Sequence, residues 1–520
     1  MMTKRTGLVS VFLTAIAVFG LLFVTPSFAE VVLKIGTLSN DANQLDPHIS
    51  TKSQDKILFP WVFNGLVRFA PGTADLSQIE ADLAESWTTS SDGLTWTFKL
   101  RKGVKFHSGY GELTADDVVF SLNRASKKET STAYKGYADF ASVTALDKYT
   151  VKIVLAKPIP SLLGMVTNYH GGYIVSKKAV EKLGDNFKTN PIGTGPFAFS
   201  EYQSKRQVTL VANKDYFLGA PKIDKIIYRY LPDEASRELA FKNGELDLIY
   251  GTREQRWVER IRKDKGVTVD IIGLGELRTL HMNSSKGALK DIRVRQAIAH
   301  AVNRDEMVAF VGQDVAQSSV SVVPQGYLGH TSDVPLYNHD LAKAKALLKE
   351  AGYPDGITLK VIITKVASLR VPMEVLQAQL RKAGIILDLE VVEHSAFHKL
   401  IRQDASSLVL YGAARFPVAD SYLTQFYLSD SIVGTPTAIT NFSHCDVADA
   451  EINAARSEAD QAKQLALWKT AQQKILKQSC SVPVFEQLIV WARTSKLDYG
   501  FDMKNSLSNG PIINEMTTLK

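Results

Sequence analysis

Cysteine is nearly absent from this sequence, which has two, Cys445 and Cys480, among 520 residues. Neither follows the apolar run at the N-terminus, so a lipid anchor attached to cysteine is not expected there. In an oxidising compartment the two would form a disulfide that closes a loop of moderate length. Two buried free thiols are the alternative hypothesis, and the sequence alone leaves both open.

Long apolar runs are also missing beyond the N-terminus. Lys4 and Arg5 precede an apolar run over residues 7–24, and small residues up to Ala29 follow the pattern that signal peptidase recognises. We therefore expect a signal peptide over residues 1–29, with an uncleaved membrane anchor as the alternative. No later stretch approaches the ~20 apolar residues of a spanning helix. We expect a soluble protein that is secreted to the periplasm without a lipid anchor.

Runs of one charge sign are absent as well. The net charge is +7, and loss of Lys4 and Arg5 with the signal peptide lowers it to +5. Basic residues alternate with acidic ones, which argues against a nucleic-acid partner. Hydrophobic residues make up 45% and charged residues 22% of the chain, a balance typical of folded globular proteins. Because single cores stop growing near ~250–300 residues, we expect at least two lobes.

Catalytic and nucleotide-binding motifs are missing. The glycine-rich segment 193–196 lacks the Gly-Lys-Ser/Thr ending of a phosphate loop, so we interpret it as a tight structural turn. After Gly273 and Gly275, Arg278 stands where a dinucleotide-binding loop needs a third glycine. Neither Gly-x-Ser-x-Gly nor His-Glu-x-x-His occurs. We predict no catalytic residues and no cofactor.

One pair of histidines has a spacing that metal sites use. His394 and His398 are four residues apart beside Glu393, which on a helix would form a metal-binding face. The segment follows an expected strand that ends at Val392, so the two rings are not expected to share a face. We favour a surface or cleft-edge histidine pair and predict no metal.

The periodicity of apolar residues indicates mixed α and β structure. Apolar residues alternate with polar ones over 94–101, which predicts a strand. Thr114 and Asp117 resemble a capping box before a helical pattern that runs to Ala125. A second helix is expected after Asp340, followed by strands over 359–363 and 385–392 with a helix between them. This alternation predicts an α/β lobe in the second half.

Four groups of motifs follow one another along the chain. They are 83–107 with 113–121; 190–197 with 213–216 and 244–247; 283–304 around Arg293-Val294-Arg295-Gln296-Ala297-Ile298; and 344–356 around Glu350-Ala351-Gly352-Tyr353. In this order they resemble the family 5 extracellular solute-binding proteins, which include dipeptide-, oligopeptide-, nickel- and opine-binding proteins. The resemblance covers most of the chain after the signal peptide.

The resemblance implies an α/β fold of two lobes with a hinge, an inter-lobe ligand cleft and a discontinuous first lobe. Lobe I would span 30–283, including an extra subdomain around 70–200; lobe II would span 284–486, and 487–520 would return to lobe I. The implied function is that of a periplasmic substrate-binding protein of an ABC importer, not an enzyme. Its partners would be a small-molecule ligand and ABC permease subunits of the inner membrane, and we expect a monomer.

The segment 411–422 departs from the peptide-binding members. There it resembles Trp-Gly-x-Asp-Tyr-Pro-Asp-Pro-Asp, and the first aspartate holds the α-ammonium group of the peptide. Here Arg415 stands at that position, and Val418-Ala419 replaces the following Asp-Pro. Because a guanidinium donates up to five N–H bonds in a planar fork, we predict that Arg415 binds an anionic group. The alternative is a structural Arg415 that turns outward or pairs with Asp420.

Other candidate ligand-binding residues fall where the resemblance puts cleft segments. Arg253 and Lys365 follow expected strands and would add positive charge. Aromatic walls would come from Trp257, Tyr411 and Phe416, and short polar contacts from Ser39, Asn40, Ser395 and Asn441.

We therefore expect a small polar ligand with an anionic group: an acidic opine, a sugar phosphate of the agrocinopine kind, or an acidic peptide. An ordinary di- or oligopeptide-binding protein is the first alternative and a metal-chelate binder the second. A periplasmic hydrolase is the rival hypothesis from another class of protein.

Overall fold

The computed structural model describes residues 29–520 except 43, 51, 160 and 435–439. The expected signal peptide, residues 1–29, lies outside the described residues apart from Ala29. Residues Val31–Lys520 form one compact unit of mixed helices and strands. Within the described part of the chain, no helix combines the length and the apolar character that a membrane span needs.

The local elements follow from side-chain periodicity and helix caps. The alternating segment forms strand β5 (Thr95–Leu100), in which Phe98 and Leu100 are buried. Helix α3 (Ala115–Ala125) begins with the expected capping box between Thr114 and Asp117. Asp340 caps α10 (Leu341–Glu350) by accepting a hydrogen bond from the backbone of the first turn. These predictions are confirmed.

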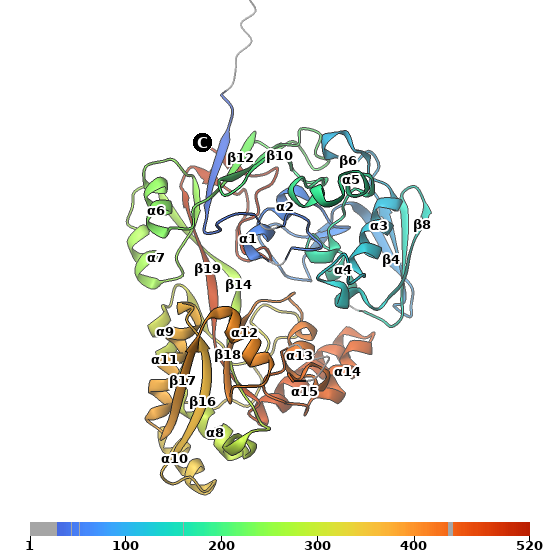
Figure 1. The fold of residues 1–520 in the computed structure, drawn as a ribbon. Coiled ribbons are helices and arrows are strands. Elements are labelled where there is room, and N and C mark those ends of the chain that lie inside the picture. The colour runs from blue at the N-terminus through green and yellow to red at the C-terminus, as the bar shows by residue number, and fades with distance from the viewer. Residues whose placement is uncertain (1–28, 43, 51, 160, 435–439) are drawn as a thin grey trace, which may run out of the picture. The chain divides into compact units, whose positions relative to one another are not determined.

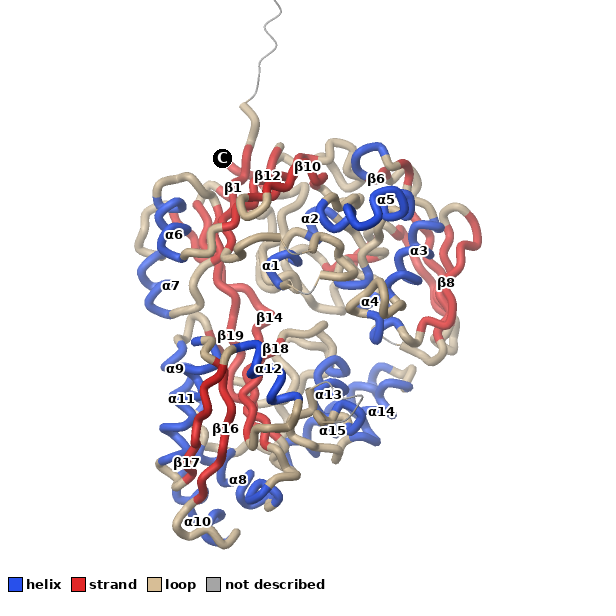
Figure 2. Tube along the Cα trace, in the orientation of Figure 1, coloured by secondary structure: helices blue, strands red, loops and turns tan. Residues whose placement is uncertain are grey.

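A nine-stranded mixed sheet forms the centre of the unit (Figures 1 and 2). Its strands, in spatial order, are β10 (Phe197–Gln203), β11 (Gln207–Ala212), β12 (Lys225–Tyr230), β1 (Val32–Thr37), β13 (Leu248–Tyr250), β19 (Ser481–Thr494), β14 (Val267–Met282) and β18 (Leu408–Ala413), with β15 (Ala316–Ser318) also paired to β19. Strands β14 and β19 are the longest and pair antiparallel, with register shifts between Ile272 and Glu276 and between Arg278 and Thr279. Both run from one lobe into the other (Figure 1).

The buried side chains on β14 and β19 change hydrophobic cluster partway along each strand. On β14, Ile272 packs in a cluster built from residues 33–272 and the C-terminus, whereas Leu280 packs in a cluster of the second half. On β19, Phe485 and Ile489 are divided in the same way. The expected α/β fold of two lobes with a discontinuous first lobe is therefore confirmed. The expected boundary after residue 283 stays a prediction, and the exchange of clusters on β14 lies earlier in the chain.

Lobe I carries a smaller antiparallel sheet beside the large one. It contains β4 (Ala84–Thr89), β5, β9 (Thr150–Leu155) and β8 (Phe140–Asp147), and α3 packs on it. Short helices α1 (Ser53–Lys56), α2 (Phe59–Val62), α4 (Leu162–Met165) and α5 (Lys177–Leu183), together with α6 (Glu234–Lys242) and α7 (Gln255–Ile261), complete this part. Near the C-terminus, β20 (Leu497–Asp498) pairs with β21 (Thr518–Leu519), and Ile513 packs in the lobe I cluster.

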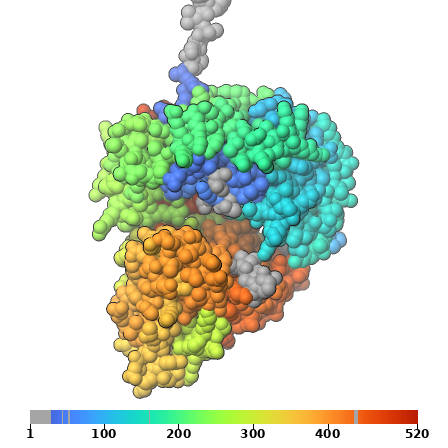
Figure 3. All heavy atoms as spheres, in the orientation of Figure 1, coloured from blue at the N-terminus to red at the C-terminus, as the bar shows by residue number. Residues whose placement is uncertain are grey.

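Lobe II contains a parallel strand–helix–strand unit and a group of helices. Strands β16 (Ile357–Thr364) and β17 (Ile385–Val392) pair in parallel through α11 (Ala367–Arg381), as the alternating pattern predicts. The remaining helices are α8 (Ile292–Ala301), α9 (Arg304–Val311), α10, α12 (His394–Arg402), α13 (Ala419–Tyr427), α14 (Asp449–Ser457) and α15 (Gln461–Lys477). In the space-filling view, the surface is hollowed between the blue and green segments of lobe I and the orange segments of lobe II (Figure 3).

The glycine-rich segment 193–196 is a close contact between two stretches of backbone. A Cβ added to Gly193 would lie 2.0 Å from the carbonyl oxygen of Val62, and one added to Gly195 would lie 2.6 Å from the carbonyl carbon. The carbonyl oxygen of Gly195 also lies 2.9 Å from Nε2 of His107. These close contacts explain why glycine stands at both positions, and the explanation does not require a bound phosphate.

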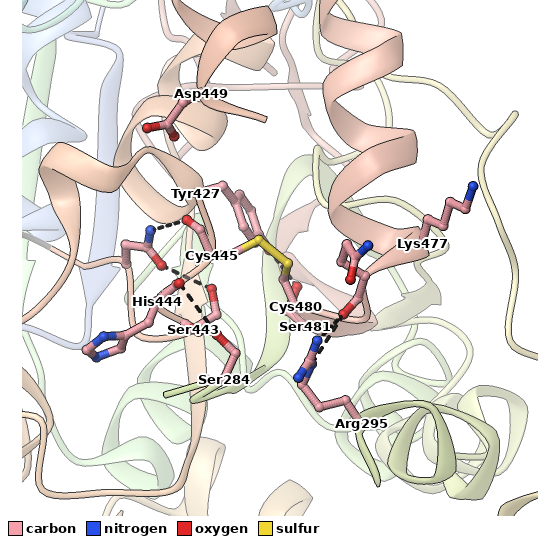
Figure 4. Close-up of a disulfide and its surroundings, with 12 residues drawn as sticks. Ser284, Arg295, Tyr427, Ser443, His444, Cys445, Asp449, Lys477, Cys480 and Ser481 are labelled. Atoms are coloured by element: carbon pink, nitrogen blue, oxygen red, sulfur yellow. Dashed lines mark hydrogen bonds between the residues drawn. A yellow bond between two sulfur atoms is a disulfide. The ribbon is translucent and has the colours of Figure 1, made fainter. Parts of the chain in front are cut away.

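Cys445 and Cys480 form a disulfide in lobe II, with their Cα atoms 5.8 Å apart (Figure 4). The bond joins the segment before α14 to the residue that precedes β19, and it closes a loop across 35 residues. Both cysteines are buried. Because the cysteines are buried, a reductant has little access to the disulfide in the folded protein. In the unfolded protein the disulfide holds the ends of this loop together.

Removal of the disulfide should lower the free energy of unfolding by ~3–4 kcal/mol, because the cross-link restricts the unfolded chain. Urea unfolding of the wild type, with and without reductant, measures this difference. The double variant C445A/C480A should unfold like the reduced wild type and should not respond to reductant. Alkylation of both thiols in unreduced, unfolded protein would contradict the disulfide.

Candidate functional site

The segment that carries Arg415 connects β18 to α13, and its backbone is fixed by one tyrosine. The Arg415 N–H donates to Tyr327 Oη at 3.1 Å, and Tyr327 Oη donates to the Arg415 carbonyl oxygen at 2.8 Å. Tyr327 is itself buried. This paired contact sets the direction in which the Arg415 side chain leaves the backbone.

The guanidinium of Arg415 is half-buried, and only some of its N–H groups donate to acceptors in the protein. Its Nε donates to Gln425 Oε1 at 2.5 Å and its Nη1 donates to the Ala414 carbonyl at 2.9 Å. The guanidinium carbon lies 5.5 Å from the centre of the Phe426 ring, a cation–π contact. Among the described residues Arg415 has no carboxylate partner, and Nη2 has no acceptor.

Asp420, the alternative partner that we considered for Arg415, contacts other residues. Its Oδ1 lies 3.7 Å from Nε of Arg456 and accepts a hydrogen bond from Thr424. The hypothesis that Arg415 pairs with Asp420 is therefore wrong, because a different arginine on α14 reaches the carboxylate.

Lobe I brings a second cation to Arg415. Lys56, the last residue of α1, places Nζ 3.0 Å from Nε2 of His170, and the ring of Tyr169 stacks on His170 at 3.9 Å between centroids. Burial and the charge of Arg415 lower the pKa of Lys56 to about 8. Burial, Lys56 and Arg415 together hold the pKa of His170 well below its usual value, so this imidazole is neutral.

A third group of charges lies where β14 and β19 pass between the lobes. Glu276 Oε2 lies 2.8 Å from Nη2 of Arg278 and 3.5 Å from Nη1 of Arg253. Arg278 also donates to Gln487 Oε1 at 2.7 Å. Burial raises the pKa of Glu276, but Arg253, Arg278 and Arg415 outweigh it and lower that pKa. One carboxylate thus serves two arginines, and the Arg415–Lys56 pair lacks a negative partner of its own.

Arg253, a sequence-predicted site residue, is drawn into this charge group. It donates two hydrogen bonds to Tyr250 Oη, at 3.1 and 2.7 Å, in addition to its contact with Glu276. Burial would lower the pKa of Arg253, but Tyr250 and Glu276 raise it above its usual value. Most of its donors therefore have protein partners.

Phe416, on lobe II, contacts residues of lobe I. Its ring lies 5.9 Å from that of Tyr169 and 6.4 Å from that of Phe69, between centroids. A Cβ added to Gly164 would lie 2.3 Å from Phe416 Cζ, so the ring occupies the space that the missing side chain leaves. Arg415 and Phe416 thus bring lobe II to the Lys56–His170 group.

Tyr411, on β18, lies in an aromatic group inside lobe II. Its ring centroid is 5.2 Å from that of Phe442, 6.0 Å from Phe426 and 6.2 Å from His398. Tyr411 also lines a small cavity together with His281 and other residues of β14 and α13. It stands between the Arg415 segment and α12.

In the part of the chain that the structure describes, the other residues predicted for the site do not contact the Arg415 group. Trp257 is buried between α6 and α7 and donates to Glu238 at 2.9 Å. Asn441 is fully buried and donates to the Leu428 and Cys445 carbonyls at 3.0 and 2.8 Å. Their polar atoms are used to hold the fold. The remaining residues, with their partners or exposure, are Ser39, which donates to the Asp41 carbonyl; Asn40 and Ser395, which are exposed; and Lys365, which is exposed and paired with Glu393.

The histidine pair differs from our expectation. Helix α12 begins at His394, so His394 and His398 share one helical face, with their Nε2 atoms 3.2 Å apart. The expectation that the rings would not share a face is wrong, because β17 ends at Val392 and the helix starts two residues later.

Several residues of the charge groups have no sequence motif: Lys56, Tyr169, His170, Glu276 and Arg278. A signal existed for the last two, because charged residues inside the long apolar strand β14 must find partners or a ligand when they are buried. Lys56 and His170 carry no such signal, since each lies in a very short helix of lobe I and not in a long apolar strand.

Comparisons with known proteins show similarity over most of the chain. Residues 78–433 match the family described as bacterial extracellular solute-binding proteins, family 5. The dipeptide-binding protein of Escherichia coli K12 is 31% identical over 68% of this chain and 70% of that protein. Di/tripeptide-binding protein 4 of Pseudomonas aeruginosa UCBPP-PA14 is 32% identical over 81% of this chain and 83% of that protein.

A solved structure is similar over nearly the whole chain. It is the solute-binding protein MoaA of Agrobacterium tumefaciens R10 in complex with mannopinic acid, at 47% sequence identity. The TM-score is 0.83, and the match covers 95% of this chain and 100% of that one. The likeness therefore includes both lobes and the strands that join them.

Proposed function

Because this chain belongs to the bacterial extracellular solute-binding proteins of family 5, we propose that it captures an acidic opine and delivers it to an ABC importer. Capture would occur as the lobes close on the ligand at Arg415, Lys56 and the aromatic residues beside them. The ligand would be released to permease subunits in the inner membrane. We propose a periplasmic monomer, secreted through the signal peptide expected over residues 1–29.

A single observation carries the anionic character of the ligand. Arg415 and Lys56 come from different lobes, act on each other electrostatically and have no carboxylate partner of their own among the described residues. Removing two positive charges from water without a counter-ion is costly, and a bound carboxylate offsets this cost. Arg415 Nη2, which has no acceptor among the described residues, would donate to that carboxylate.

The choice of an opine acid among anions is supported by the similarity to MoaA. That protein was solved with mannopinic acid and is 47% identical to this chain. The peptide-binding relatives are 31–32% identical. The resemblance to the family also places Arg415 where peptide-binding members hold the ammonium group with an aspartate. A group that repels an ammonium argues against an ordinary peptide with a free N-terminus.

Calorimetric titration of purified, refolded protein tests the proposal. Refolding removes carried ligand, and the panel contains mannopinic acid, other opine acids, sugar phosphates, neutral dipeptides and acidic dipeptides. We expect binding of mannopinic acid or a close opine acid, with weaker or no binding of neutral dipeptides. Binding confined to dipeptides would support a peptide-binding protein instead, and turnover of a bound compound would support a hydrolase.

The ionisation of Lys56 predicts how ligand affinity depends on pH. In the free protein its pKa is about 8, and a bound anion should raise it. Binding should therefore take up a proton just above pH 8, and affinity should fall as the pH rises through this region. Below pH 8 Lys56 is already charged and should add no pH dependence. Calorimetry at pH 8.5 in two buffers of different ionisation enthalpy measures the proton uptake.

The variant K56M supplies the control for this effect. It should abolish the proton uptake and weaken binding, while the exposed Lys128→Met should change neither. Because the folded-state pKa of Lys56 lies below its unfolded value of 10.5, stability contributed by this group rises between pH 8 and 10.5 and is lowest below pH 8. K56M should therefore raise the melting temperature of the ligand-free protein at pH 7. Equal proton uptake in K56M and wild type would exclude Lys56 as its source.

A further inference from the structure

Two histidines on α12 bring their nitrogen atoms close together outside the charge groups described above. His394 and His398 are one helical turn apart, and their Nε2 atoms lie 3.2 Å from each other. Their ring centroids are 4.5 Å apart and the rings are inclined by 72°. Each ring thus directs the same nitrogen to a shared point at the helix surface.

This separation suits two ligands of one metal ion. Zinc–imidazole bonds are ~2.0–2.1 Å long, so two such bonds at a tetrahedral angle put the nitrogens ~3.3 Å apart. Two histidines at positions i and i+4 of a helix also form the ligand pair of known zinc sites. A metal ion can therefore enter between the rings with little movement of either side chain.

The neighbouring strand orients one of the two rings. His394 Nδ1 lies 3.1 Å from Oγ1 of Thr364, and the same oxygen accepts the N–H of Val366 at 3.1 Å. In the tautomer that carries its proton on Nδ1, His394 donates to this oxygen and keeps the Nε2 lone pair for a metal. Hydrogen bonds of this kind fix the tautomer of metal-ligating histidines. His398 Nδ1 has no partner among the described residues, so a hydrogen bond of this kind orients His394 but not His398.

The charged side chains beside the pair have partners of their own. Arg402 Nη1 donates to the carbonyl oxygen of His398 at 3.1 Å. Lys365 is bound to Glu393 in an exposed ion pair. Both cations are thus held by groups other than the two imidazole rings.

We propose that His394 and His398 bind a divalent transition-metal ion through their Nε2 atoms. Imidazole suits copper, nickel and zinc, and copper(II) should bind most tightly of these. Among the described residues no group of three or more histidine, cysteine, aspartate or glutamate side chains could hold a metal. The remaining coordination positions therefore belong to water or to a small external donor.

Helix α12 places the proposed metal site near the segment that carries Arg415. His398 lies 6.2 Å from Tyr411 between ring centroids, and Tyr411 lies on β18, the strand that leads into the segment carrying Arg415. The metal would lie at the border of the proposed ligand site and would not need the opine to bind. The inference therefore goes beyond the proposed function and can fail separately from it.

Titration of copper(II) and zinc(II) into tag-free, ligand-free protein tests the site. We expect the protein to bind one equivalent of copper. Electron spin echo envelope modulation should then detect nitrogens from two imidazole rings. H394A and H398A should each weaken binding at least tenfold, whereas the exposed control H339A should leave it unchanged. Equal affinity of wild type, H394A and H398A would overturn the proposal.

A second pair of variants tests the supporting hydrogen bond. T364V removes the oxygen beside His394 and should weaken metal binding ~10-fold, the lower end for such outer contacts. T364S keeps the hydroxyl and should bind like the wild type. Circular dichroism and opine binding serve as folding controls. Loss of metal binding in T364S as well would mean that the strand, not the hydrogen bond, positions His394.

Discussion

Replacement of Arg415 with alanine should weaken the binding of mannopinic acid, or of whichever opine acid binds best, by ~30-fold or more. Truncating one partner of a buried, hydrogen-bonded charge pair costs ~2–5 kcal/mol, largely because the other charge is left unpaired. In this protein the ligand carboxylate would remain near Lys56 but lose the guanidinium. The loss should appear mainly as faster dissociation, measured by stopped-flow fluorescence, and as a weaker affinity, measured by calorimetry.

Two further arginine variants make the result specific. R415K keeps the positive charge but loses the planar fork, and its affinity should lie between those of R415A and the wild type. R370A removes a half-buried arginine that pairs with Glu374 one turn along α11, and it should bind like the wild type. Unchanged affinity in R415A would show that Arg415 is a structural residue and that the anion binds elsewhere.

A methyl group added at Gly164 should interfere with lobe closure. The Cβ of G164A would lie 2.3 Å from Phe416 Cζ, much closer than two carbon atoms pack. Overpacking of this kind costs ~1–3 kcal/mol, so ligand affinity should fall roughly 5- to 150-fold. Within lobe I the same Cβ would lie 2.7 Å from Leu76 Cδ2, the end of a flexible side chain that must shift to make room. Alanine is otherwise more favourable than glycine within a helix such as α4, so the stability of lobe I should change less than the ligand affinity.

A double-mutant cycle separates this clash from other effects. In the F416A background the ring is absent, so G164A should cost little additional affinity. Gly136 provides a matched control, since a Cβ added there meets no atom within 4 Å. G136A should bind like the wild type. An equal loss of affinity from G164A with and without the Phe416 ring would mean that the two residues do not meet in the bound state.

Local structure was predictable because it depends on neighbours in the sequence. The alternation over 94–101 and the capping box of Thr114 and Asp117 are properties of one strand and of one helical turn. The motifs that resemble the family also lie in order along the chain. Two lobes, mixed α/β structure and the class of protein could therefore be predicted from the printed sequence.

Part of the candidate site was predictable for a different reason. The resemblance places Arg415 where peptide-binding members have an acid, and this prediction needs only a single segment of the sequence. The sequence could not exclude a pair with Asp420, because both residues lie on the same connection. The structure decides this point, since Arg456 of helix α14 contacts the carboxylate of Asp420.

For other predicted site residues the ligand-binding role stays a prediction, because residue type does not report burial. Trp257 and Asn441 have side chains suited to a ligand, but here Trp257 bonds to Glu238 and Asn441 to backbone carbonyls of its own lobe. A buried polar atom must have a partner, and protein groups nearby supplied one in each case. Only the position of each side chain in the fold distinguishes these roles.

The mixed α/β elements, the motifs of the family and the arginine at position 415 could be predicted without a structure, because each is encoded by residues close together in the sequence. Which charges meet depends on how the two lobes are folded together. Lys56 and His170 come from lobe I and Arg415 from lobe II, hundreds of residues apart in the chain. Charges interact through space over a few ångströms, and that distance is set by how β14 and β19 join the two lobes.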